Sequence, residues 1–300
     1  MDFIKQKDAD NIDFVCKILT DSAFADIKSI ALLPSGSRSF SYYVDDYIVR
    51  FPKAEIIWQT IQREKTVIDS VYPHLMPYFE DKIHKIELVD GAYPFSVSQR
   101  FKGKICDGRP ESEHALLYQN LQPAEQLRLA QDLAMFFNLM HRIDYTTLDI
   151  PEPTDVIDNW GVSSRKDFDY AAIKEVLLAH QIDLDDYQIA FPNTEKALCH
   201  NDLSGSNMLI NPKNKDVLTG IIDFGNTIMM PKYLDFFPLY KIHRKLAVET
   251  LKEYNKLATS AIEQKQADFA ALCYIGYGLA QNKNTPSPYF MKLLNCFCAE

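Results

Sequence analysis

Residues 197–226 read ALCHNDLSGSNMLINPKNKDVLTGIIDFGN, and this stretch sets the expected fold. It contains three short apolar segments, at 197–199, 208–210 and 218–222, each typical of a buried β-strand. Polar residues follow the first and the third segment, and residues 211–216 have the composition of a hairpin loop. Carboxylates buried at strand ends are costly unless a cation or a proton transfer uses them. The pattern therefore indicates a functional site built from two loops.

The two loops read His200-Asn201-Asp202-Leu203-Ser204-Gly205-Ser206-Asn207 and Asp223-Phe224-Gly225. This order matches the kinase catalytic loop, H-R-D-L-x-x-x-N followed by D-F-G. Phosphoryl transfer needs a carboxylate near the acceptor hydroxyl and oxygen ligands for Mg²⁺. We expect Asp202 to take the first role. We expect Asn207 and Asp223 to bind the metal, since Mg²⁺ takes few protein oxygens beside phosphates and waters. Either loop alone is also compatible with a simple turn, but both in order favour catalysis.

Asn201 stands where protein kinases usually carry arginine, and small residues precede Asn207. With these features the motif resembles the aminoglycoside phosphotransferase family, particularly its 2''-phosphotransferase branch, within a group that includes choline and macrolide kinases. The resemblance implies an α+β, two-lobed protein-kinase-like fold with a five-stranded antiparallel N-lobe sheet and a mainly helical C-lobe. It also implies Mg²⁺, ATP or GTP as phosphoryl donor, a loop-supporting role for His200, and a place for Ser204 near the phosphate path.

Residues 1–100 are expected to form the nucleotide-binding lobe, and residues 101–300 the lobe with the catalytic loop and the substrate site. Strands are predicted at 30–33, 41–44, 47–51, 83–88 and 94–99. Ser35, Gly36 and Ser37 lie between the first two strands, where their backbone amides could cover nucleotide phosphates. A plain β-turn is equally compatible with one glycine. The resemblance favours the phosphate-covering loop, because the family uses a serine-rich flap there.

Arg50 occupies the place of the family's phosphate-binding lysine, within Val49-Arg50-Phe51-Pro52-Lys53. Arginine holds phosphate bidentately but does not replace lysine conservatively. Glu64 follows fourteen positions later inside a predicted helix at 54–71, where the family places the ion-pair partner. Arg63 and Lys65 flank it, so Glu64 as one more solvated charge stays an alternative. Gln99, Arg100 and Phe101 resemble the interlobe hinge, whose backbone would meet the purine edge.

Helices are predicted for the second lobe at 123–144, 167–178, 233–245, 249–264 and 267–279. The first is apolar nearly all round and is therefore expected to be central and buried. His141, near its end, is interpreted as structural. Beyond Gly225 the pattern departs from the family, because Asn226 replaces a second aspartate whereas Asp235 is retained.

Composition narrows the possible functions. Three hundred residues with 47% hydrophobic content suit a two-lobed unit with a sizeable core. A net charge of −9 argues against nucleic acid as a partner. The six cysteines form no zinc-type spacing, no apolar run suits a membrane span, and the amino terminus lacks a signal-peptide pattern. We expect a cytoplasmic protein, monomeric or dimeric.

The expected function is transfer of a nucleotide γ-phosphate to a hydroxyl of a small molecule. Aminoglycosides, the antibiotic-resistance substrates of the family, are polycations and require a carboxylate-lined pocket. Residues 228–300 instead hold nine basic and six acidic residues. Four acidic residues could still converge on the cleft: Asp155, Asp158, Asp202 and Asp235. Two alternatives stay open: a kinase of an amino alcohol, sugar or macrolide-like molecule, and a nucleotide-binding pseudoenzyme suggested by Arg50.

Overall fold

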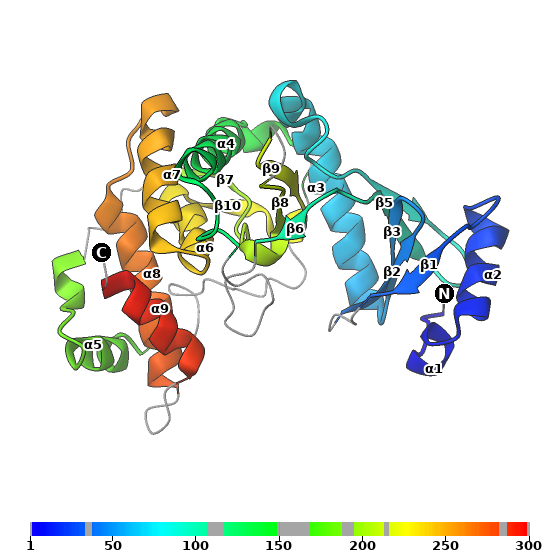
Figure 1. The fold of residues 1–300 in the computed structure, drawn as a ribbon, viewed down its shortest axis with the longest axis horizontal. Coiled ribbons are helices and arrows are strands. Elements are labelled where there is room, and N and C mark those ends of the chain that lie inside the picture. Colours follow the sequence, from blue (N-terminus) through cyan, green and yellow to red (C-terminus); the bar gives the residue numbers. More distant parts are fainter. Residues whose placement is uncertain are drawn as a thin grey trace. The chain divides into compact units, whose positions relative to one another are not determined.

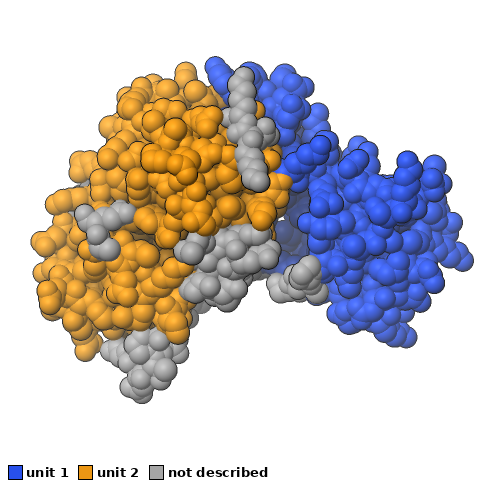
Figure 2. Space-filling model, viewed as in Figure 1, with its two compact units in different colours: residues 1–102, 148–156, 223–225 blue, residues 103–147, 157–222, 226–300 orange. Residues whose placement is uncertain are grey.

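The computed structural model describes residues 2–33, 38–106, 117–148, 150, 169–187, 195–212, 216–281 and 287–298. The chain divides into two compact units (Figure 2). Unit 1 consists of residues 1–102, 148–156 and 223–225, and unit 2 of residues 103–147, 157–222 and 226–300. The predicted boundary at residue 100 lies near the end of the first segment at Lys102. The nucleotide- and substrate-binding roles of these regions stay predictions.

Unit 1 contains the predicted five-stranded antiparallel sheet, with the strand order β1-β2-β3-β5-β4. Its strands are β1 (Ile30–Leu32), β2 (Ser39–Val44), β3 (Tyr47–Pro52), β4 (Ile86–Val89) and β5 (Phe95–Gln99). Alternate residues of β2 are buried, as expected for a strand with one face on a core. Asp45 adopts a left-handed backbone (φ 51°) between β2 and β3, which permits the tight connection.

The helices of unit 1 are α1 (Gln6–Ala9), α2 (Ile12–Ser22) and α3 (Glu55–Phe79). Asn11 caps α2 by accepting a hydrogen bond from the Phe14 amide. Figure 1 shows the sheet between α2 on one side and α3 on the other. Apolar residues of α1, α2, β2, β3 and β5 share one core. The predicted end of α3 at residue 71 was wrong, since the helix continues through Pro73 and Pro77.

Unit 2 contains two small sheets. Its strands are β6 (Lys104–Ile105), β7 (Lys196–Cys199), β8 (Met208–Ile210), β9 (Leu218–Ile221) and β10 (Ile228–Pro231). β7 pairs with β10, and β8 lies between β6 and β9. The motif at residues 200–207 therefore follows β7 of the two-stranded sheet. The motif at residues 223–225 follows β9 of the three-stranded sheet. The sequence analysis did not predict β6 or β10.

The helices of unit 2 are α4 (Pro123–His141), α5 (Tyr170–Leu178), α6 (Phe237–Tyr240), α7 (Arg244–Leu257), α8 (Gln264–Ala280) and α9 (Pro288–Cys298). Short 3-10 turns lie at η1 (Tyr145–Thr147), η2 (Leu184–Tyr187), η4 (Gly205–Asn207), η5 (Phe224–Asn226, shared with unit 1) and η6 (Lys232–Phe236). A capping box of Gln122 and Glu125 starts α4, which is largely buried and packs along α7 (Figure 1).

Three predictions for the helices of unit 2 need correction. The single helix predicted at 233–245 is interrupted, because η6 and the short α6 precede a new helix that begins at Arg244. α7 ends at Leu257, seven residues before the predicted end at 264. The sequence analysis missed α9. Asp167 and Phe168, the predicted start of α5, lie outside the described residues.

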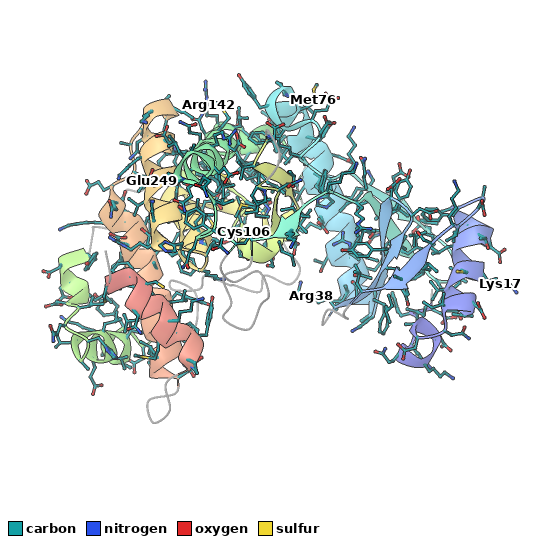
Figure 3. All side chains as sticks on the ribbon, viewed as in Figure 1. Lys17, Arg38, Met76, Cys106, Arg142 and Glu249 are labelled. Atoms are coloured by element: carbon teal, nitrogen blue, oxygen red, sulfur yellow. The ribbon has the colours of Figure 1, made fainter. Side chains whose placement is uncertain are left out.

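The surfaces of the units carry charged side chains, such as the exposed Lys17 on α2, whereas Cys106 after β6 is buried (Figure 3). In the described part of the chain, no helix is both long enough and apolar enough to cross a membrane.

Candidate active site

The carboxylate of Asp235 holds the backbone at the start of the predicted catalytic loop, residues 200–207. Asp235 lies in η6 and is fully buried. Its two oxygens accept hydrogen bonds from the amides of His200 (3.1 Å) and Asn201 (2.8 Å). Asn201 adopts a left-handed backbone (φ 64°), which turns the chain sharply after β7. Asparagine tolerates this conformation better than most residues. Asp235 therefore fixes the loop, and its complete burial argues against the possibility that it contributes to an acidic pocket.

Asp202 follows this turn directly. Its amide donates to His200 Nδ1 (3.3 Å), which gives the buried His200 a loop-supporting contact. Asn226 Nδ2 donates to Asp202 Oδ2 (3.3 Å), so the residue that replaces the family's second aspartate contacts the predicted catalytic carboxylate. Burial raises the pKa of Asp202, although the charges of Lys241 and His200 and the hydrogen bonds from the Asn226 and Asn207 side chains oppose the shift. A carboxylate with a raised pKa is a stronger proton acceptor, as general-base chemistry requires.

Asn207 closes the loop that starts at Asp202. Its side-chain amide donates to the Asp202 carbonyl (2.8 Å), and its own carbonyl accepts from the Ile222 amide (3.0 Å). With the NH₂ group engaged, the side-chain oxygen is the atom that can bind a cation. Asp223, which follows Ile222, adds a carboxylate held on a left-handed backbone (φ 64°). An amide oxygen and a carboxylate oxygen are each ligands that Mg²⁺ accepts. Their metal-binding role stays a prediction.

Ser204 is half-buried beside Asp202, and its amide donates to the Asp202 carbonyl (2.7 Å). Its hydroxyl contacts the hydroxyl of Ser206 (2.9 Å). Ser204 is therefore held in the same turn as the predicted catalytic carboxylate, and its predicted role near the phosphate path stays open to test.

In unit 1, Arg50 and Glu64 form the ion pair that the resemblance to the family implies. Arg50 Nη2 lies 2.7 Å from Glu64 Oε2. His84 Nε2 lies 3.2 Å from the other oxygen of Glu64, a contact that the sequence analysis did not foresee. Burial alone would raise the pKa of Glu64, but Arg50 and His84 together lower it to about 2. Glu64 is therefore a buried, ionised anchor for Arg50 and no solvated surface charge.

Arg63 is a second residue that the sequence analysis missed. Its flanking position beside Glu64 suggested a surface charge, yet it is 5% exposed and donates to the Gly225 carbonyl. Phe224 packs near His84, with 6.2 Å between ring centroids. Residues 223–225 are therefore tied to α3 by a hydrogen bond and to the Glu64 cluster by a ring contact. No sequence signal marked these contacts, because each depends on tertiary packing.

The predicted hinge residues lie at the end of β5. Gln99 pairs with Tyr47, and the Arg100 amide donates to the Asp46 carbonyl (2.8 Å). The Arg100 guanidinium lies 3.9 Å from the centroid of the Tyr43 ring. Phe101 follows and is half-buried. The nucleotide-binding roles of these three residues stay predictions. Ser35, Gly36 and Ser37, like Asp155 and Asp158, lie outside the described residues.

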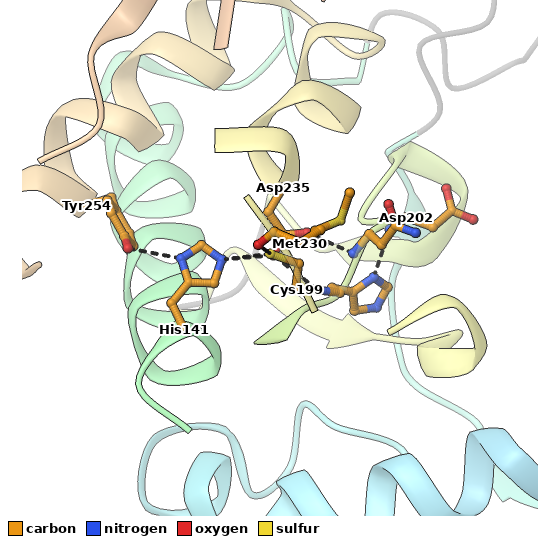
Figure 4. Close-up of polar contacts among 8 residues, drawn as sticks. His141, Cys199, Asp202, Met230, Asp235 and Tyr254 are labelled. Carbon is orange, nitrogen blue, oxygen red and sulfur yellow. Dashed lines mark hydrogen bonds and ion pairs between the residues drawn. The ribbon is translucent and has the colours of Figure 1, made fainter. Parts of the chain in front are cut away.

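A buried network centred on His141 lies beside the catalytic loop (Figure 4). His141 Nδ1 contacts the Tyr254 hydroxyl (2.9 Å), and Nε2 contacts Asp235 Oδ2 (3.1 Å). Cys199 Sγ lies 3.7 Å from His141 Nε2, and burial raises the pKa of this thiol well above its ordinary value. The position of His141, beneath Asp235, agrees with its structural interpretation. The network links α4 and α7 to the catalytic loop.

Comparisons with solved structures define the fold class. The chain resembles a GDP complex of aminoglycoside 2'-phosphotransferase-IIIa, with a TM-score of 0.67, 18% identity and coverage of 95% of this chain and 96% of that one. It resembles the streptomycin–ATP complex of APH(2")-IIa with a TM-score of 0.60, 17% identity and coverage of 100% and 98%. For a choline/ethanolamine kinase family protein from Mesorhizobium loti the values are 0.56, 15%, 96% and 92%. The fold is the predicted protein-kinase-like one.

Residues 29–265 match the phosphotransferase enzyme family, abbreviated APH, and the chain belongs to that family. The match spans the sheet of unit 1, both motif loops and helices α4 to α7. The resemblance inferred from the sequence is thereby confirmed, as is the predicted enzyme class, a phosphotransferase with an alcohol group as acceptor.

Proposed function

We propose that this protein transfers the γ-phosphate of ATP or GTP, with Mg²⁺, to a hydroxyl of a small molecule. The observation that carries the proposal is the loop at Asp202. The half-buried carboxylate of Asp202 has a raised pKa, and hydrogen bonds to Asp235 and from Asn207 hold the loop that bears it. A carboxylate held in this way can orient the acceptor hydroxyl and take its proton.

The other roles follow from the family and from the chemistry of each group. Arg50, anchored by Glu64, would bind the nucleotide phosphates, and Ser35, Gly36 and Ser37 would cover them. Gln99, Arg100 and Phe101 would meet the base. Asn207 and Asp223 would hold Mg²⁺, which when bound neutralises charge on the phosphates. Solved relatives support a nucleotide donor, since they were determined with GDP, ATP or ADP.

We also propose that the phosphate acceptor carries fewer positive charges than an aminoglycoside. Solved relatives bind kanamycin, gentamicin and streptomycin, as their names state. In this chain, however, Asp235 is fully buried beneath the loop, and residues 228–300 have a basic excess. Kanamycin-like polycations are then poor substrates. The favoured acceptor is a metabolite such as a sugar or a singly charged alcohol, rather than a substrate of antibiotic resistance.

The location proposed is the cytoplasm. All six cysteines carry free thiols, which supports a reducing compartment.

The test is phosphoryl transfer from ATP and from GTP to a panel of aminoglycosides, amino alcohols, sugars and macrolides, with and without Mg²⁺. Asp202→Asn should lower transfer by about 10²- to 10⁴-fold while nucleotide binding stays nearly intact. Asp216→Asn, at an exposed position of the same unit, is the matched control. Full turnover by Asp202→Asn would remove Asp202 from the catalytic role.

A second measurement tests the alternative that the protein is a nucleotide-binding pseudoenzyme. Wild-type protein should bind nucleotide more tightly with Mg²⁺, and Asp223→Ala should abolish that increment. Equal, metal-independent binding by both proteins, without transfer to any acceptor, would favour the pseudoenzyme.

A further inference from the structure

Arg63 on α3 is a buried cation that reaches the second motif, Asp223-Phe224-Gly225. The residue is 5% exposed, and its Nη1 donates to the Gly225 carbonyl, 162 positions later in the chain. A guanidinium loses hydration when it is buried, so arginines seldom occupy such positions. Hydrogen bonds from a charged donor are roughly twice as strong as those between neutral groups. This bond therefore ties the backbone of the motif firmly to α3.

Gly225 also lies against the surface of α3. A Cβ atom at Gly225 would lie 3.7 Å from Thr60 Cγ2 and 4.0 Å from Glu64 Cβ, at ordinary van der Waals distance. The Thr60 hydroxyl donates to the Ile56 carbonyl (2.9 Å) of its own helix, so the methyl group of Thr60 is the part that faces Gly225. The turn of α3 at residues 60–64 therefore packs on Gly225, and Arg63 supplies the hydrogen bond.

The backbone of Asp223 is the reason that this support matters. Asp223 has a left-handed backbone (φ 64°), which costs free energy in a residue other than glycine and persists where the surrounding structure holds it. On the earlier side, the amide of Ile222 donates to the Asn207 carbonyl (3.0 Å). On the later side, Gly225 accepts the hydrogen bond from Arg63. The conformation that presents the Asp223 carboxylate is therefore fixed from both sides, and one of the two bonds comes from α3.

We propose that Arg63 is a positioning residue for Asp223: by holding the Gly225 carbonyl, it fixes the backbone that presents the Asp223 carboxylate to Mg²⁺. The inference rests on the proposed function, because it assumes that Asp223 binds the metal of a nucleotide complex. It deepens that function by giving neighbouring residues of α3 separate tasks. Glu64 orients Arg50 towards the nucleotide phosphates, and Arg63 orients Asp223 towards the metal.

The test measures the binding of ATP and of GTP, first in EDTA and then over a range of Mg²⁺ concentrations. Arg63→Met should raise the half-saturating Mg²⁺ concentration on the order of tenfold, the usual effect of removing a group that orients a metal ligand. Its nucleotide affinity in EDTA should stay that of wild-type protein. Glu64→Gln should instead lower the affinity in EDTA, because Arg50 loses the carboxylate that orients it. Arg63→Lys, which keeps a charged donor, should raise the Mg²⁺ requirement less than Arg63→Met does.

Lys65→Met is the matched control, because it removes the same charge from α3 at a more exposed side chain that pairs with Asp69. It should leave the affinity in EDTA and the Mg²⁺ requirement unchanged. A second control uses the Asp223→Ala background, in which Mg²⁺ no longer strengthens nucleotide binding. Adding Arg63→Met there should change nothing further if Arg63 acts through Asp223. A residue that only supports the fold would still lower the nucleotide affinity.

The results separate the inference from the proposed function. A wild-type Mg²⁺ requirement in folded Arg63→Met, or an equal loss of affinity with and without Mg²⁺, overturns the inference while the proposed function stands. Urea denaturation without metal shows whether Arg63→Met is folded. If it is not, Arg63→Gln decides, since its neutral side chain is shorter than that of arginine, and an unchanged Mg²⁺ requirement overturns the inference. Absence of Mg²⁺-dependent nucleotide binding by wild-type protein overturns the proposed function, and the inference with it.

Discussion

Each unit of the molecule buries one carboxylate that holds a part of the site, but the two are satisfied in different ways. Glu64 in unit 1 is 2% exposed and lies between a guanidinium and an imidazole, those of Arg50 and His84. Asp235 in unit 2 is fully buried and accepts from two backbone amides and from His141. The first carboxylate positions another side chain, whereas the second positions the backbone itself. Removing each should therefore have different consequences.

The largest effect is expected for Asp235→Asn. The asparagine side chain keeps one acceptor oxygen, but its NH₂ group replaces the other. This NH₂ group and a backbone N–H are both donors, so at least one buried N–H loses its hydrogen-bond partner. We expect a loss of about 3–5 kcal/mol in the free energy of unfolding. Catalytic turnover of the remaining folded protein should fall as well, because the backbone at His200 and Asn201 is no longer fixed. Chemical denaturation and kinetics on the same samples measure both.

Asp268→Asn is the matched control for that variant. Asp268 is also buried in unit 2, but among the described residues its hydrogen-bond partners are Tyr240, Arg244 and Gln264, none of which belongs to the catalytic loop. The Asp268→Asn variant should have a lower free energy of unfolding, whereas its folded fraction should keep the catalytic turnover of wild-type protein. Normal turnover in Asp235→Asn would show that the loop holds its conformation without this carboxylate.

Glu64→Gln should have the next largest effect, and one that depends on pH. The pKa of Glu64 falls from 4.5 to about 2 on folding, which corresponds to about 3 kcal/mol of stability. Because the folded pKa is the lower one, this contribution is complete above about pH 4.5 and is lost as the pH falls towards 2. Wild-type and Glu64→Gln proteins should therefore differ most in urea denaturation at neutral pH, and the difference should shrink below pH 4. A constant difference would mean that Glu64 acts through packing and not through its charge.

The contrast between the carboxylates also separates what the sequence predicts from what it cannot. The pairing of Arg50 with Glu64 could be predicted because both residues match positions in the pattern of the family that the sequence resembles. His84 and Arg63 reach the same place only through tertiary packing, and neither lies in a recognisable motif. Asp235 could be matched to the family by its position after the second motif. Its carboxylate, however, binds the backbone amides of His200 and Asn201, which lie 35 and 34 positions earlier in the chain. Sequence patterns identify charged residues but not the amides they bind.

The helices show the same limit. Apolar spacing located α4 and α8, whose faces are largely buried. It failed at residues 233–245, where η6 and α6 are followed by an extended backbone at His243 before α7 begins. It also ended α3 too early, because Pro73 and Pro77 are tolerated inside that helix. Packing overrode local preference at both places.

Arg50→Lys should have a smaller effect. The charge towards Glu64 is kept, but the guanidinium also reaches the Ser96 hydroxyl through Nε (3.4 Å), which an ammonium cannot replace. We expect a loss of about 1 kcal/mol in stability, with the acid dependence of wild-type protein retained. Urea denaturation at pH 7 and pH 3 measures both quantities. Loss of the acid dependence would show that the planar guanidinium, and not the positive charge alone, keeps the pKa of Glu64 low.

The smallest single effect is expected for Tyr254→Phe, which removes only the hydroxyl that contacts His141 Nδ1. A loss of about 0.5–1 kcal/mol is expected, because one hydrogen bond to the imidazole is removed. The informative measurement is a double-mutant cycle with Asp235→Asn. Both residues contact the same imidazole, so their effects should be coupled by about 0.5–3 kcal/mol. The cycle of Tyr254→Phe with Glu64→Gln should be additive within about 0.5 kcal/mol, because among the described residues these two side chains share no hydrogen-bond partner. Additivity in the first cycle would mean that the imidazole does not transmit the effect of the hydroxyl to Asp235. The anchoring of the loop would then depend on Asp235 and the two amides alone.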